Sequence, residues 1–169
     1  MSEEPTPEAK KPPRADVPRY YRVACRFFDD EKVRRWPDWA KLFALYLLTS
    51  KHRNLEGLFV LPPNYIAADL RWTLKRVMTG LEFLSKEEFL LFDLETNLLL
   101  LKNALRYQQP DSPNVLKGVL GRLRNLPDNP QMFKEFARLA KQHCYRSGLT
   151  AHAQSFPVLL CKEFNIQVP

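Results

Sequence analysis

The chain has 169 residues, of which 45% are hydrophobic and 12% aromatic, with a formal net charge of +7 and a pI near 9.4. This length suits one domain with appendages and argues against a second full domain. No apolar run reaches the roughly 20 residues of a membrane span, and three cysteines are too few for a disulfide framework. The sequence therefore predicts a cytoplasmic protein without a membrane anchor, and its charge favours polyanionic partners.

The N-terminal residues 1–18 hold five prolines and almost no apolar side chains, which predicts a disordered leader. Residues 19–28 alternate aromatic and aliphatic side chains with arginines and predict a strand or extended segment that packs onto the core. A charged turn is expected at residues 29–31. The excess of basic residues lies beyond the leader, with four more basic than acidic groups in each of the ranges 19–107 and 108–169.

A buried helix is predicted over residues 39–49, because apolar residues recur at i, i+3, i+4, i+7 and i+8 from Trp39. We interpret Trp36 and Trp39 as core residues of this region rather than as a platform on which bases stack. Residues 57–61 are β-prone and are followed by two prolines, which predicts a brief edge strand. Asn64 is expected to cap a short helix that ends at Leu70.

A tight turn at Arg71 and Trp72 is expected to lead into a second amphipathic helix that Thr73 caps and that ends near Ser85. The predicted inward stripe repeats at three and four residues and consists of Leu74, Val77, Met78, Leu81 and Leu84. The opposite face carries Lys75, Arg76, Thr79 and Glu82.

Two apolar runs at 89–92 and 98–101 predict a β-hairpin, with Asn97 able to take a positive φ in the turn. The resulting order of helix, strand, helix, turn, helix, strand, strand is that of a winged helix-turn-helix, whose hairpin is the wing. The predicted fold class is therefore mainly α with a small β-hairpin, and the winged-helix domain spans 19–107.

A linker is predicted over residues 108–113, followed by a helical C-terminal extension over 114–169. Within it, Asn114 and Asn129 are expected to cap helices over 114–125 and from residue 130 to about 145. The apolar residues of both helices need a partner surface, so the two helices should pack together and onto the winged-helix domain.

The sequence predicts neither catalysis nor a cofactor. Its glycines form no phosphate-binding or dinucleotide fingerprint. His143, His152 and the cysteines Cys144 and Cys161 lack zinc-site spacing, so no metal is expected. We interpret Cys25, Cys144 and Cys161 as small buried hydrophobic residues.

The residues that favour DNA lie at the start of the second amphipathic helix. Lys75 and Arg76 would meet a major groove, with Thr79 one turn further on and Arg71 as a candidate phosphate contact. Arginine can read guanine with two hydrogen bonds, and lysine can hold a phosphate. The alternative is a mixed-charge, solvated face, because acidic residues such as Glu82 lie close by.

A second basic cluster, Lys117, Arg122 and Arg124, lies in the extension. These residues would either extend the surface that contacts DNA or lie on a solvated helix face without a ligand. The predicted wing is acidic, because Asp93 and Glu95 outweigh the basic residues at its tip.

Several segments resemble a known family. They are Tyr20-Tyr-Arg-Val23, Leu45-Tyr-Leu-Leu-Thr-Ser50, Glu56-Gly-Leu-Phe59, Ile66-Ala-Ala-Asp-Leu70 and Asn103-Ala-Leu-Arg-Tyr107. Over roughly residues 19–127 the chain resembles the winged-helix N-terminal domains of phage and prophage replication initiators, or replisome organisers, which are related to DnaD-like primosomal proteins. The resemblance implies binding to an origin or to single-stranded DNA and recruitment of a helicase loader or helicase. The chain departs from this family in its acidic wing and in its short region after the linker.

Two hypotheses follow from the sequence. In the first, the chain is a DNA-binding replication initiator, or within the same binding class a transcriptional regulator. In the second, it is a protein-interaction adaptor that docks partners through its acidic wing and leaves DNA alone. The face at Lys75 and Arg76 favours DNA, whereas the acidic wing and the apolar segment 156–160 favour a protein partner.

Overall fold

The computed structural model describes residues 21, 23–145 and 148–167. The predicted leader at 1–18 lies outside the described residues. The elements in chain order are η1 (Cys25–Asp29), α1 (Glu31–Arg35), α2 (Asp38–Thr49), β1 (Leu58–Val60), α3 (Pro63–Leu70), α4 (Leu74–Lys86), β2 (Leu90–Phe92), β3 (Leu98–Leu101), α5 (Ala104–Tyr107), α6 (Pro113–Leu123), α7 (Pro130–Cys144) and α8 (Ala151–Glu163). The chain is thus mainly helical, with a small antiparallel sheet, as the sequence predicted at that level.

The sheet has the strand order β1-β3-β2, and both pairings are antiparallel. Leu100 of β3 lies opposite Leu58 of β1 and Leu91 of β2. The predicted edge position of β1 and the predicted hairpin are confirmed. Asn97 takes a φ of 56° in the hairpin turn, also as predicted.

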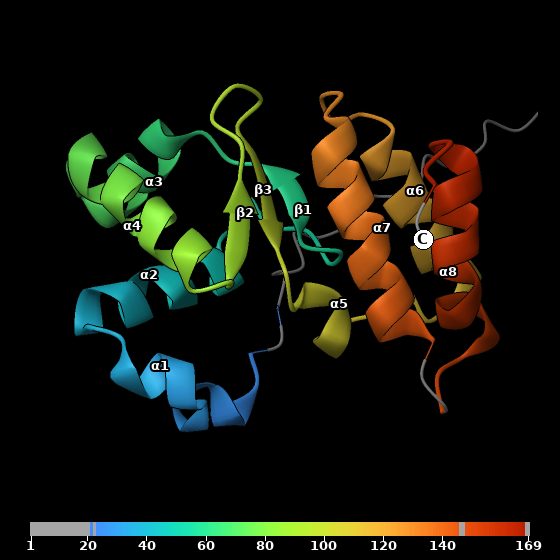
Figure 1. Cartoon of the computed structure of the whole chain (residues 1–169), viewed down its shortest axis with the longest axis horizontal. Helices are drawn as coiled ribbons and strands as arrows, with labels where there is room; N and C mark the ends of the chain where they lie inside the picture. Colours follow the sequence, from blue (N-terminus) through green and yellow to red (C-terminus); the bar gives the residue numbers. More distant parts are fainter. Residues whose placement is uncertain (1–20, 22, 146–147, 168–169) are drawn as a thin grey trace, which may run out of the picture.

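The central strand β3 is buried on both of its faces, because helices cover the sheet from two sides (Figure 1). Side chains alternate along a strand, so its four leucines divide into two pairs. Leu99 and Leu101 belong to the hydrophobic cluster of α1 to α4, whereas Leu98 and Leu100 belong to the cluster of α6, α7 and α8. The sheet is the middle of three layers.

In the first layer, α4 packs against α2 at a point where only glycine fits. A Cβ atom added to Gly80 would lie 2.6 Å from ring atoms of Phe43, which is fully buried. This close approach fixes the position of α4, and with it the face that α4 turns outward. Trp36 is buried in the same layer, as predicted, and its indole Nε1 donates a hydrogen bond of 2.9 Å to Glu87.

In the second layer, α6 and α7 pack with α8 and onto the sheet through one hydrophobic cluster. The predicted packing of the two extension helices onto the body is therefore present, but each of them lies mainly against α8, whereas the sequence predicted that they pack against each other. The third helix, α8, was not predicted, because its interior contains Pro157, a residue that normally interrupts a helix. Pro157 is buried, and Thr150 caps the helix by accepting a hydrogen bond from the amide of Ala153.

Several local predictions were wrong at helix starts. The predicted strand or extended segment at 19–28 forms no strand among its described residues and turns into the 3₁₀ helix η1 at Cys25, while residues 19, 20 and 22 lie outside the described residues. The expected charged turn opens α1, because the side chain of Asp30 accepts hydrogen bonds from the amides of Lys32 and Val33. The expected caps Asn64 and Asn114 lie inside helices, since Pro63 and Pro113 occupy the first helical positions.

A buried ion pair joins the loop before β1 to α6. Glu56 is fully buried, and Arg122 donates to both of its carboxylate oxygens, at 2.9 Å from Nε and 2.8 Å from Nη2. The hydrogen bond with Glu56 raises the pKa of Arg122. Removing one member of such a pair strands the other charge in the protein interior. The pair therefore fastens the second layer to the loop that leads into the sheet.

We predict that Arg122→Ala lowers the free energy of unfolding by about 2 kcal/mol, since buried Glu56 would be left without its guanidinium partner while half-exposure of the arginine moderates the cost. Chemical denaturation measures this. Arg124→Ala is the matched control, because Arg124 pairs with Glu163 on the exposed surface and should leave the midpoint unchanged. Equal effects of the two substitutions would contradict a fastening role for the buried pair.

We also predict that truncation after Tyr107 lowers solubility and increases binding of a hydrophobic dye, because it uncovers Leu58, Leu98 and Leu100. A chain lacking residues 1–16 is the control, since the sequence predicts few packed side chains there. A truncated chain that stays monomeric, soluble and free of dye would show that the second layer is dispensable.

Candidate nucleic-acid interface

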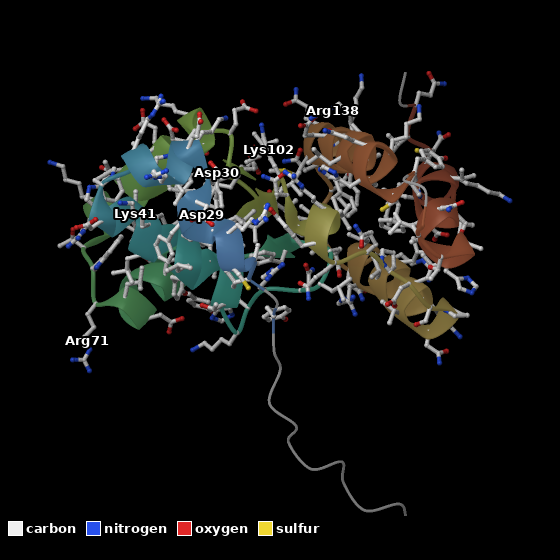
Figure 2. The ribbon with its side chains drawn as sticks, turned by 90° about the horizontal axis from the view of Figure 1, so that it is seen from below. Asp29, Asp30, Lys41, Arg71, Lys102 and Arg138 are labelled. Atoms are coloured by element: carbon white, nitrogen blue, oxygen red, sulfur yellow. The ribbon has the colours of Figure 1, made fainter. Side chains whose placement is uncertain are left out.

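The turn between α3 and α4 places Arg71 at the edge of the molecule. Arg71 has left-handed backbone angles, φ 53° and ψ 40°, which suit glycine better than arginine. The amides of Arg71 and Trp72 close the end of α3 by donating to the carbonyls of Ala68 and Ala67, at 3.3 and 3.0 Å. Figure 2 shows the Arg71 side chain pointing away from the ribbon. The turn thus presents a cation in a conformation that carries a steric cost.

The first turn of α4 is ordered by two interactions. The Thr73 hydroxyl accepts a hydrogen bond of 3.3 Å from the amide of Arg76, so the predicted cap is confirmed. The guanidinium of Arg76 lies 4.0 Å from the centroid of the Trp72 ring, which is close enough for a cation–π interaction. This interaction holds the guanidinium while leaving Arg76 exposed. The sequence prediction missed this role of Trp72, although the spacing of four residues was a signal for it.

Lys75 and Thr79 lie one turn apart on the exposed face of α4. The Thr79 hydroxyl donates to the carbonyl of Lys75 at 3.0 Å, which leaves its oxygen free to accept. One turn further on, Glu82 is bonded to Lys86 at 2.7 Å, and this bond lowers the pKa of the Glu82 carboxyl. The face is therefore cationic at its start and locally neutral at its end.

An open groove of about 510 Å³ separates α4 from the β2–β3 turn, and Lys75, Glu82 and Leu94 are among its lining residues. Asp93 is partly exposed, and its carboxylate accepts hydrogen bonds from the backbone and hydroxyl of Thr96, which lower its pKa. At the tip, Glu95 is exposed, and Leu94 has 61% of its surface exposed. The turn thus carries the carboxylates of Asp93 and Glu95 beside the apolar side chain of Leu94.

The acidic residue closest in sequence before Arg71 is engaged elsewhere. Asp69 accepts hydrogen bonds from the Tyr46 hydroxyl at 2.8 Å and from Lys51 at 3.2 Å. Burial and the bond to Asp69 raise the pKa of Tyr46 to about 12, and the same bond lowers the pKa of Asp69. This network ties α3 to the end of α2, and it partly neutralises the carboxylate near the turn.

The structure does not bring the two predicted basic clusters together, because α6 and α4 lie on opposite sides of the sheet (Figure 1). Arg122 is paired with buried Glu56, and Arg124 donates to Glu163 at 2.6 Å. Lys117 is exposed and forms no ion pair within the described part of the chain. The second cluster therefore presents one unpaired cation.

The apolar stripe and the cysteines differ in part from the sequence interpretation. Leu74 was expected to face inward, but it is 47% exposed at the very start of α4, where no described element covers it. Cys25 was expected to be buried and is exposed, whereas Cys144 is buried, which raises the pKa of its thiol to about 11.

Among residues 21, 23–145 and 148–167, no three His, Cys, Asp or Glu side chains gather where they could hold a metal ion.

Within the described ranges, no helix has both the length and the apolar character needed to cross a membrane. Comparisons of the chain with protein-family models, with curated proteins and with solved structures find no match.

Proposed function

We propose that the chain binds duplex DNA through a winged helix-turn-helix, in which α4 is the recognition helix and the β2–β3 hairpin is the wing. The observation that carries this proposal is the cluster of three exposed cations, Arg71, Lys75 and Arg76, around the start of α4. Within the described residues none of the three forms an ion pair. The order α2, β1, α3, α4, β2, β3 supports it further.

Each cation has a distinct role in this mechanism. Arg76, held over Trp72, would present its planar guanidinium to a base edge in the major groove, where arginine donates two hydrogen bonds to guanine. Lys75 and Arg71 would contact phosphates on either side of the groove and set the register of the helix. The Thr79 oxygen would accept from a base amino group one turn further into the groove.

The distribution of acids limits the contact area. The exposed Glu95 would repel phosphate, whereas Glu82 is neutralised by Lys86, so the DNA would contact the first two turns of α4 and the α3–α4 turn rather than the wing tip. The resemblance to phage replication initiators adds a role at a replication start, with recruitment of a helicase loader or helicase, to this proposal. A transcriptional role would use the same DNA-binding residues.

A second candidate function is that of a protein-interaction adaptor. It is favoured by the α4–wing groove, where Leu94 at the tip is 61% exposed, and by Leu74, which is 47% exposed at the start of α4 outside the lining of that groove. In this case a partner protein would cover Leu94, and the cations of α4 would steer it rather than DNA. Binding to duplex oligonucleotides at two salt concentrations separates the candidates, because phosphate contacts make affinity strongly salt-dependent.

We predict that the double substitution Lys75→Ala and Arg76→Ala weakens duplex binding by ~1–3 kcal/mol for each base-specific interaction that it removes and lowers the log–log salt slope by about one per phosphate contact. Gel-shift titrations measure both, and circular dichroism checks the helix content. The control is Lys134→Ala with Lys162→Ala, two exposed lysines on α7 and α8. Duplex affinity that is unaffected by the first pair would exclude α4 as the recognition helix.

We further predict that Arg71→Gly raises the free energy of unfolding by about 1 kcal/mol and at the same time weakens duplex binding. Glycine takes the left-handed conformation without steric cost, whereas it lacks the cation. Thermal denaturation and gel shifts on one protein preparation measure both effects. Loss of stability would show that the arginine side chain packs on the turn, and full DNA affinity would show that it does not reach phosphate.

A further inference from the structure

Arg53 is a buried cation without an acidic partner. It is only 3% exposed, and its two terminal nitrogens donate to the carbonyl of Leu48 at 2.7 Å and to the side chain of Gln108 at 3.0 Å. The Tyr21 ring lies 4.8 Å from the guanidinium carbon. Within the described residues no carboxylate pairs with Arg53, and its Nε has no hydrogen-bond partner. Buried arginines are ordinarily paired, so an uncompensated charge at this position points to an anionic ligand.

Arg53 contributes to the wall of an open depression of about 610 Å³ between the loop before β1 and the start of α6. The polar part of its lining consists of Tyr21, Arg53, Asn54, Asn114 and Arg122, and no aspartate or glutamate of the described residues belongs to that lining. Glu56 is buried behind Arg122, so the two arginines and this one carboxylate leave a net charge of +1 at the site.

We propose that this depression binds a phosphate group. Arg122 uses Nε and Nη2 to hold Glu56, while its half-exposed side chain leaves Nη1 available as a donor. Asn114 lies in the first turn of α6, where the helix dipole favours an anion. Phosphate oxygens accept well from such a combination of arginine and helix start. Burial lowers the pKa of Arg53, and an anion nearby would offset that effect.

This site contains no residue of α4 and does not depend on the proposed DNA interface. The phosphate has two conceivable sources, a small phosphate compound or the backbone of a nucleic acid. Both offer the same oxygens to Arg122 and Asn114, so experiments with inorganic phosphate test the site itself, and oligonucleotides then identify the source.

The test variant is Gly118→Glu, made in the full chain. A Cβ atom at Gly118 would lie 3.4 Å from Nη1 of Arg122 and would meet no other atom, so a glutamate there places its carboxylate in the depression without a clash. The matched control is Gly121→Glu on the same helix. A Cβ atom at Gly121 would meet no other atom, and Gly121 does not line the depression. Both substitutions replace a helical glycine and change the net charge equally.

At constant ionic strength, replacing chloride with inorganic phosphate should raise the thermal midpoint of the unaltered chain and of Gly121→Glu, but not of Gly118→Glu. Titration followed by phosphorus NMR should show at least a tenfold weaker apparent affinity for phosphate in Gly118→Glu. An equal response of all three proteins, or the absence of a response in the unaltered chain, would overturn the proposal.

Duplex and single-stranded oligonucleotides then distinguish the sources. If the phosphate belongs to a nucleic acid, Gly118→Glu should also reduce the salt slope of oligonucleotide binding by about one phosphate contact. If it belongs to a small compound, oligonucleotide binding should not change while the response to inorganic phosphate is abolished. The double substitution at Lys75 and Arg76 should leave the phosphate response intact, so failure of the proposed DNA interface and failure of this site are separable.

Discussion

The arrangement of this protein depends on the burial of β3 from both sides. A strand whose side chains alternate can serve two hydrophobic clusters only if both kinds of position are apolar, and the run of four leucines at Leu98–Leu101 meets that condition. One face receives α2 and α4, and the other receives α6, α7 and α8. Because each leucine pair needs its own layer, neither layer can be removed without exposing part of the central strand.

This constraint decides which basic residues are available at the surface. On the first layer, the close approach of Gly80 and Phe43 holds α4 so that its other face, with Lys75 and Thr79, is exposed. On the second layer, α6 is fastened to the loop before β1 by Arg122 and Glu56. Arg122 keeps only Nη1 for a ligand, because Nε and Nη2 hold Glu56, whereas within the described residues the cations at the start of α4 keep all of their donors.

Several charged side chains are held by neighbours within the protein and are therefore less available to a ligand. Asp69, Asp93 and Glu87 are each engaged by a neighbour, through Tyr46, Thr96 and Trp36 respectively. Arg53 is the exception. It is buried, and within the described residues its hydrogen-bond partners are all neutral. Arg71 combines a left-handed backbone with an exposed side chain. These two arginines depart most clearly from what stability alone would favour, and such departures are typical of functional sites.

The helices, caps and turns whose formation depends on residues close together in the sequence could be predicted from the sequence alone. Apolar periodicity indicated α2, α4 and α7, and short-range hydrogen-bonding residues indicated the Thr73 and Asn129 caps and the turn at Asn97. Such features depend on neighbours within about one helical turn. At α3 and α6 the sequence indicated a helix but not its first residue. The helices begin at Pro63 and Pro113, one residue before the asparagines that were predicted as caps.

Features that depend on distant residues emerged only from the folded chain. Pro157 lies inside α8 and is buried there, next to Phe156 of the second hydrophobic cluster, which periodicity does not reveal. The role of Arg122 depends on Glu56, which is 66 residues away, and the isolation of Arg53 depends on which carboxylates the fold brings near it. Charges interact through space rather than along the chain, so their partners, and therefore their availability for a ligand, follow from packing and not from sequence position.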